Sequence, residues 1–74
     1  MVSDDVRTIL VNLPISVRGF CYLDSEGMPC IVLNARLSEE TRRKAFRHEM
    51  NHIRSGDIDN KLYHEYSEVI HDRS

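Results

Sequence analysis

The sequence His48-Glu49-Met50-Asn51-His52 has the pattern H-E-x-x-H, and the rest of the chain is interpreted around it. Two histidines four residues apart lie one above the other on the same face of an α-helix. Their ring nitrogens can then bind one tetrahedral metal ion, most often zinc. Glu49 projects beside the pair, where its carboxylate can act as general base toward a water molecule activated by the metal. The pattern therefore predicts a metal-binding helix.

Start and stop signals on both sides of the motif support a helix. Ser38 is a favourable N-cap, and Glu39 and Glu40 follow in the first turn, where the helix dipole stabilises acidic side chains. Gly56 supplies the residue that commonly follows a helix C-terminus, so the helix is predicted to run to about Ser55. Its apolar stripe comprises Phe46, Met50 and Ile53. His48 and His52 lie along one edge of that stripe, next to the predicted core.

The first part of the chain is predicted to form a short helix over residues 3–13. Apolar residues recur there at helical spacing: Val6, Ile9, Leu10 and Leu13. Pro14 is expected to end this helix, because the residue before a proline avoids the helical conformation.

A β-hairpin is predicted between this helix and the motif. Residues 17–23 are rich in β-branched and aromatic side chains, and residues 30–34 are apolar nearly throughout. The turn over residues 24–27 ends in a glycine, which suits a left-handed position. The apolar run over residues 30–34 is typical of a strand that is covered on both faces.

The two cysteines lie one in each predicted strand. If Leu23 pairs with Met28, Cys21 lies opposite Cys30 and the two thiols come within bridging distance. The alternative, which we favour for a reducing compartment, is two small half-buried thiols. The C-x-x-C spacing of a metal site is absent.

A C-terminal helix is predicted over residues 60–71. Its apolar row comprises Leu62, Tyr66 and Val69, widened by Tyr63 and Ile70. Its opposite face carries His64, Glu68 and His71, with Glu65 beside them. A catalytic zinc site needs a third protein ligand, and we predict Glu68 because a carboxylate completes a His₂Glu set. The alternatives are His64, Glu65, His71 and Asp57.

Length and composition predict a single domain over residues 1–74. A chain of 74 residues has a small core and gains stability from a bound metal. The net charge of −2 argues against binding to nucleic acid or to an anionic membrane, and the basic residues at positions 42–44 and 47 are interpreted as a solvated helix face. No apolar run approaches the roughly 20 residues of a membrane span, and no signal peptide is recognised, so the cytoplasm is expected.

The segment over residues 17–57 resembles the ImmA/IrrE family of zinc metallopeptidase-like proteins. The resemblance rests on the strand that ends in Asn34, on the motif helix and on the Gly56-Asp57 step after the second histidine. The segment looks like the short members found in Gram-positive bacteria and in their phages and mobile elements. After Asp59 the resemblance is weaker, and Glu68-Val69-Ile70-His71 matches only part of the segment that carries the glutamate ligand.

The resemblance implies a small zincin-like α+β domain with a gluzincin-like mechanism. His48 and His52 would hold Zn²⁺, Glu49 would deprotonate the attacking water, and the strand over residues 31–34 would align an extended substrate. The implied partner is a protein or peptide substrate, for example a helix-turn-helix repressor. The alternative function is a non-catalytic zinc-binding protein-interaction module. The sequence predicts no oligomeric state.

Overall fold

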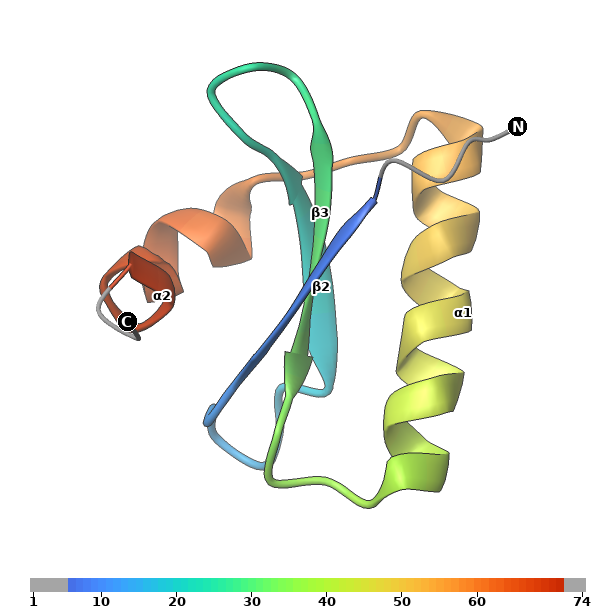
Figure 1. The fold of residues 1–74 in the computed structure, drawn as a ribbon, viewed down its shortest axis with the longest axis vertical. Helices are drawn as coiled ribbons and strands as arrows, with labels where there is room; N and C mark the ends of the chain where they lie inside the picture. The colour runs from blue at the N-terminus through green and yellow to red at the C-terminus, as the bar shows by residue number, and fades with distance from the viewer. Residues whose placement is uncertain (1–5, 72–74) are drawn as a thin grey trace.

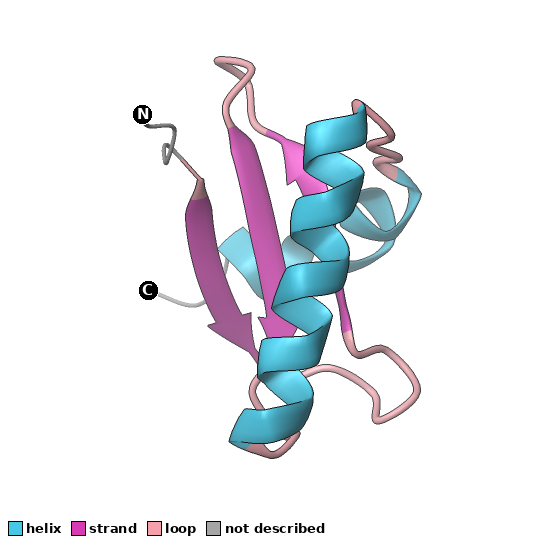
Figure 2. Cartoon of the chain, turned by 90° about the vertical axis from the view of Figure 1, so that its right-hand side faces the viewer, coloured by secondary structure: helices cyan, strands magenta, loops and turns pink. Residues whose placement is uncertain are grey.

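The structure is a computed structural model that describes residues 6–71 of the chain. Within these residues lie three strands, β1 (Arg7–Val11), β2 (Gly19–Leu23) and β3 (Pro29–Asn34), and two helices, α1 (Glu39–Ser55) and α2 (Lys61–His71). The strands form one mixed sheet in the order β1-β3-β2. Helix α1 covers one face of the sheet and α2 covers the other, as Figure 1 shows with the sheet nearly on edge and Figure 2 from the side of α1. The predicted α+β class is confirmed.

Residues 7–11 form strand β1, so the prediction of a helix there is wrong. β1 pairs in parallel with β3 over its whole length. Ile9 and Val11 are buried, whereas Leu10 between them is 53% exposed, which is the two-residue period of a strand. The apolar spacing fits either element, and pairing with the buried strand β3 decides between them. Residues 3–5 of the predicted helix lie outside the described residues.

The predicted hairpin is confirmed, but its register differs by one residue. Leu23 pairs with Pro29 rather than Met28. The turn causes the shift, because the backbone N–H of Asp24 donates to the carbonyl of Met28 at 2.9 Å and closes the turn directly after the Leu23–Pro29 pair. The side chain of Asp24 also accepts from the N–H groups of Glu26 and Met28. A shift of one residue moves every side chain of a strand to the other face.

The two cysteines therefore lie on opposite faces of the sheet. Cys21 pairs with Ile31 and belongs to the core under α1, whereas Cys30 pairs with Tyr22 and belongs to the core under α2. The predicted facing arrangement of the two thiols is wrong. The favoured alternative of free, buried thiols is confirmed.

Strand β3 is the centre of the fold, with a partner strand on each side and a helix over each face. Cys30, Ile31 and Val32 are fully buried, as their continuous apolar run predicts. On the α2 side, the core contains Ile9, Val11, Leu13, Phe20, Tyr22, Val32 and Ile70. On the α1 side, it contains Cys21, Ile31, Leu33 and Ala45, with Phe46, Met50 and Ile53 of α1 packed against it.

The side chain of Asn34, fully buried at the end of β3, holds the connection between β1 and β2. Its Nδ2 atom donates to the carbonyls of Leu13, Pro14 and Val17 at 3.1, 3.0 and 2.9 Å. Its Oδ1 atom accepts from the N–H groups of Leu13 and Arg36. These bonds satisfy backbone groups that pass over the end of β3, and they fix the start of β2.

Both predicted helices after the hairpin are confirmed. Ser38 caps α1, with its Oγ atom accepting from the N–H of Thr41, and Gly56 ends α1 in the left-handed conformation with φ of 72°. Helix α2 begins after Asp59, whose Oδ1 atom accepts from the N–H of Lys61, and its backbone departs from helical geometry at Tyr66. Neither α1 nor α2 is long and apolar enough to cross a membrane.

Candidate metal centre

His48 and His52 lie one turn apart on α1 with their rings facing each other. Their Nε2 atoms are 3.1 Å apart, and the ring planes meet at 83°. Two nitrogens bound to one tetrahedral zinc ion at about 2.0–2.1 Å lie about 3.3 Å apart. The separation also suits a hydrogen bond in which one neutral ring donates to the other. The distance between the two Nε2 atoms is therefore compatible with either arrangement.

Asp57 contacts the other nitrogen of His52. Its Oδ2 atom lies 3.4 Å from Nδ1, and its backbone N–H donates to the carbonyl of His52 at 2.8 Å. The left-handed turn at Gly56 brings Asp57 back toward the helix. A carboxylate at Nδ1 favours the tautomer with the proton on that atom, which leaves the Nε2 lone pair available to a metal.

Glu49 faces the sheet, and only 9% of its surface is exposed. Its carboxylate lies beside the thiol of Cys21. Burial, together with the nearby charges of Glu49 and Asp57, raises the pKa of the Cys21 thiol to about 12. Cys21 therefore stays protonated near neutral pH and would not act as a thiolate ligand.

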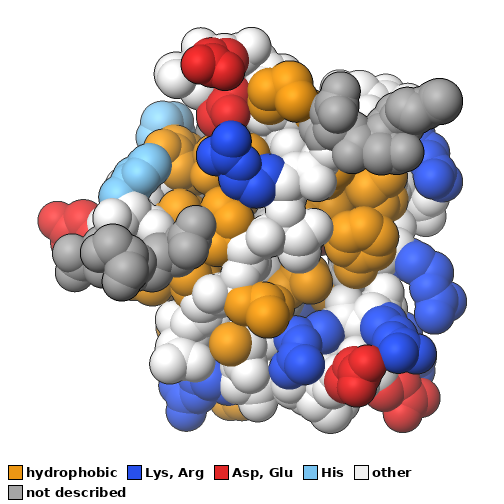
Figure 3. Space-filling model, viewed as in Figure 1, with side chains coloured by type: hydrophobic (Ala, Val, Ile, Leu, Met, Phe, Trp, Pro, Cys, Tyr) orange, Lys and Arg blue, Asp and Glu red, His pale blue; other side chains and the backbone are white. Residues whose placement is uncertain are grey.

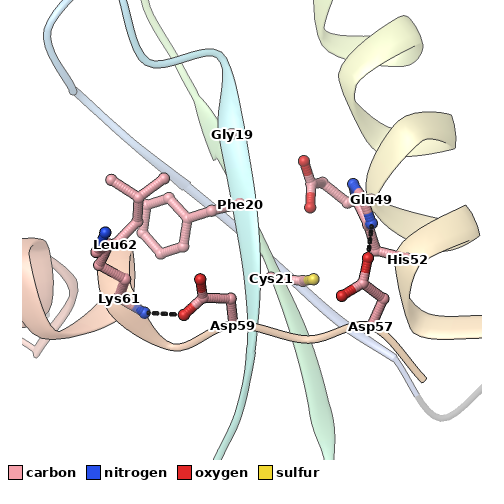
Figure 4. A pocket seen from close by; sticks show the side chains of 9 residues that line it. All are labelled: Gly19, Phe20, Cys21, Glu49, His52, Asp57, Asp59, Lys61 and Leu62. Carbon is pink, nitrogen blue, oxygen red and sulfur yellow. Dashed lines mark hydrogen bonds and ion pairs between the residues drawn. The ribbon is translucent and has the colours of Figure 1, made fainter. Parts of the chain in front are cut away.

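Two hollows meet at Gly19 and Glu49. The first, of about 370 Å³, has a wall formed by Cys21, His52 and Asp57, and it extends to the start of α2 (Figure 4). The second, of about 460 Å³, lies toward the start of β2 and the middle of α1, and is lined in part by Arg18, Lys44 and His48. His52 lines the first hollow and His48 the second, so the two adjoining hollows, together called the cleft, lie beside the histidine pair.

The floor of this cleft is the open edge of β2. Within the described sheet, β2 pairs only with β3. The carbonyl of Arg18 and the N–H of Asp24 bond to β3, so the alternate residues Gly19 and Cys21 direct their N–H and C=O groups away from it. At Gly19 a Cβ atom would lie 2.7 Å from the carbonyl oxygen of Val32, so glycine allows this close approach of the two strands.

The predicted third ligand, Glu68, lies on α2, across the sheet from α1. No residue of α1 comes within 8 Å of α2, measured between Cα atoms. His64, Glu65 and His71 are on α2 as well, and the Nε2 atom of His71 lies 2.8 Å from the hydroxyl of Tyr63. The histidine side chains that are visible in Figure 3 lie at the left, on the α2 side of the molecule, and several lysine and arginine side chains lie at the right, on the α1 side.

The structure thus brings together His48, Glu49, His52 and Asp57, and it does not bring Glu68 to them. Between residues 6 and 71 it contains no group of three or more His, Cys, Asp or Glu side chains arranged to hold a metal ion. Gly19, Cys21 and Asp59 line the cleft as well, and the sequence analysis did not assign them to the site. The glycine turn at Gly56 is a signal in the sequence that Asp57 lies near the histidines. Cys21 can be placed at the site only when the hairpin register is known.

Comparisons of the chain with known protein families, with curated proteins and with solved structures gave no match.

Proposed function

We propose that this chain is a zinc-dependent metallopeptidase-like protein that hydrolyses a peptide bond in a protein partner. His48 and His52 would hold the zinc ion, and Glu49 would act as general base. The observation that supports this most is the 3.1 Å separation of the two Nε2 atoms beside a carboxylate that is only 9% exposed. A buried acid next to two convergent imidazoles in a cleft is the arrangement expected of a hydrolytic metal site.

A zinc ion bound at the pair would supply Lewis acidity to a peptide carbonyl and would lower the pKa of a water molecule. Glu49 would take a proton from the attacking water and pass it to the amine that leaves. Asp57 would keep the proton of His52 on Nδ1. Cys21, a thiol at neutral pH beside the Glu49 carboxylate, would take no part as a nucleophile.

The remaining metal positions would be filled by water and by the substrate. Asp57 is beside the pair, but it contacts the Nδ1 side of His52. For Glu68 to reach the histidines, α2 would have to leave its face of the sheet and expose the apolar residues Leu62, Tyr63, Tyr66 and Ile70. Among residues 6–71 we therefore propose His48 and His52 alone as metal ligands, one fewer than catalytic zinc sites use, so zinc would be held less tightly than in such sites.

The substrate would bind as an extended strand along β2 rather than along β3. The segment 31–34 lies in the central strand, whose two edges are both paired, so the expected alignment by that segment is wrong. The N–H and C=O groups of Gly19, which point away from β3 beside Glu49, can bond to a peptide backbone instead. A helix-turn-helix repressor of a phage or mobile element is the proposed protein substrate, on the strength of the family resemblance.

A non-catalytic zinc-binding interaction module is the second candidate. Such a module would keep a structural metal or none, and the absence of a group of three or more ligating side chains among residues 6–71 fits the form without a metal. In this case Glu49 would contribute to the acidity of the cleft but not to chemistry. The two candidates differ in whether loss of the Glu49 charge removes an activity.

The test measures zinc binding and peptide cleavage separately. Elemental analysis should find one zinc ion per chain in the wild type and in Glu49→Gln, and a large loss in His52→Ala. His64→Ala is the matched control, because it removes a histidine from α2, and it should keep the zinc. Against a repressor fragment, Glu49→Gln should cleave at least about a hundredfold more slowly. Equal cleavage by Glu49→Gln and wild type would contradict the catalytic proposal, and equal zinc in all variants would contradict the site.

A further inference from the structure

We infer that the cleft selects extended peptides that carry a basic side chain on one side of the scissile bond and an acidic side chain on the other. This inference rests on the proposed function, because it takes the cleft beside the histidines as the substrate site. It follows from the opposite charges of the two hollows that meet at Glu49.

The hollow toward α2 is acidic. Asp57 and Asp59 come from the connection between α1 and α2 and line it together with Glu49, against one cation, Lys61. Asp59 accepts from the backbone N–H of Lys61 through Oδ1, so its second oxygen is available to a ligand. Phe20 and Leu62 give the same hollow an apolar wall. A lysine or arginine side chain suits this combination, since its stem packs on apolar surface while its charge meets a carboxylate.

The hollow toward the start of β2 is basic. Arg18 and Lys44 line it, and Ser16 and Thr41 add hydroxyl groups. Its negative charge comes from Glu49 at the junction with the other hollow. Arg18 and Lys44 make no ion pair within 4 Å among the described residues. An acidic side chain placed here gains two cations without displacing a partner from either.

The two hollows adjoin at Glu49 and Gly19. Glu49 is nine-tenths buried and lines both hollows beside the thiol of Cys21. Gly19 places no side chain at the junction, and its N–H and C=O groups point away from β3, where they can bond to the backbone of a bound peptide. The two charged hollows therefore lie on either side of one point along such a peptide.

Binding of four fluorescent peptides tests this inference without relying on cleavage. All four peptides have the same length and the same apolar residues, with one charged residue on each side of a central apolar pair. The two charged residues are lysine then glutamate, glutamate then lysine, two lysines or two glutamates. Fluorescence anisotropy is measured with zinc-loaded Glu49→Gln protein, which is not expected to cleave the peptide. The measurement is repeated with a chelator present. One of the two mixed peptides should bind about fivefold to tenfold more tightly than either peptide of uniform charge. The better order also reports the direction of the chain in the cleft.

Charge-removing variants in the same background show which hollow acts on which end of the peptide. Asp59→Asn keeps an oxygen to accept from Lys61 but loses the charge, so it should lower the preference for lysine only. Lys44→Gln should lower the preference for glutamate only. Arg47→Gln and Glu65→Gln are matched controls outside the cleft and should leave the ranking unchanged. The preference should also weaken as salt is raised, because exposed charges are screened.

Equal binding of all four peptides, or a ranking that Asp59→Asn and Lys44→Gln leave intact, would overturn the inference. Failure of the proposed function gives a different result. If the chain ranks the peptides as expected but binds no zinc or cleaves no peptide, the charge-selective cleft is supported and the proposed peptidase function is contradicted.

Discussion

The carboxylate of Asp57 lies 3.4 Å from Nδ1 of His52, while Nε2 of the same ring faces His48 at 3.1 Å. The two ring nitrogens of His52 therefore have different partners, one anionic and one suited to share a metal. Carboxylate–histidine–metal arrangements fix both the tautomer and the direction of the ring. Asp57 is thus expected to act on metal binding through His52.

Asp57→Asn is expected to weaken zinc binding about tenfold, at the lower end of the usual range for such positions. The lower end is expected because 73% of the Asp57 side chain is exposed, so water screens its charge. Competition with a chromophoric zinc chelator measures the affinity. Asp59→Asn is the control, since it removes a nearby carboxylate that does not contact His52, and an equal loss in both variants would contradict the specific role of Asp57.

Local signals in the sequence were sufficient for α1 and its histidines, because Ser38, Glu39 and Gly56 act within one turn of the helix ends. They were insufficient for β1. The spacing of Ile9 and Leu10 is compatible with a helix or a strand, and the decision comes from β3, more than 20 residues away in the chain, as Ile9 pairs with Val32. Long-range pairing of this kind leaves no mark in a short sequence window.

The incorrect predictions at the site also arise because its geometry depends on contacts between residues that are far apart in the chain. A polar row on α2 shows that the helix has a solvated face, but it does not show which face of the sheet the helix covers, so Glu68 could not be placed. Because the hairpin register differs by one residue from the predicted register, Cys21 lies next to Glu49 and not opposite Cys30. Gly19 joined the cleft because of its contact with Val32, which again depends on strand pairing.

Gly19→Ala is expected to lower the free energy of unfolding by about 1–3 kcal/mol, the usual cost of forcing extra atoms into a packed site. The added Cβ atom would lie 2.7 Å from a backbone oxygen of β3, which can move only if the strands separate. Urea unfolding followed by circular dichroism measures the change. Ser25→Ala in the exposed hairpin turn is the control and should change stability by less than about 0.5 kcal/mol. A neutral Gly19→Ala would show that β2 can shift at this point.

Asn34→Asp is expected to destabilise the fold by about 3 kcal/mol or more, although the two side chains have nearly the same shape. Nδ2 of Asn34 donates to three backbone carbonyls, and a carboxylate oxygen there would face all three without a proton. Denaturant unfolding at pH 7 measures the loss.

Lowering the pH should restore part of the stability of Asn34→Asp, because a protonated carboxyl can donate once. Asn51→Asp is the control at an exposed position of α1 and should differ little from wild type. A pH-independent loss in Asn34→Asp would mean that packing, rather than the missing donor, is responsible.

Stability is expected to fall with rising pH above about pH 9, in part because of Cys21. Burial and the neighbouring Glu49 raise the pKa of this thiol from 9.0 to about 12 in the folded chain. The folded state therefore holds the proton more tightly than the unfolded state does. The resulting stabilisation is complete below pH 9 and is lost as the pH rises toward 12. Tyr22, whose pKa is raised from 10.0 to about 12 chiefly by burial, acts in the same direction from about pH 10.

Urea unfolding at pH 7 to 11, with chelator present to exclude metal effects, should show this loss in the wild type and a smaller loss in Cys21→Ala. Tyr22→Phe should reduce the loss of stability only at the upper end of this pH range, because the unfolded pKa of Tyr22 is higher than that of Cys21. Comparing how steeply the free energy of unfolding falls with pH separates this effect from the cost of the cavity that each substitution leaves, because that cost is the same at every pH. Equal slopes for wild type and Cys21→Ala would mean that the thiol ionises as readily in the folded chain as in the unfolded chain. The burial of Cys21 beside Glu49 would then be absent in solution.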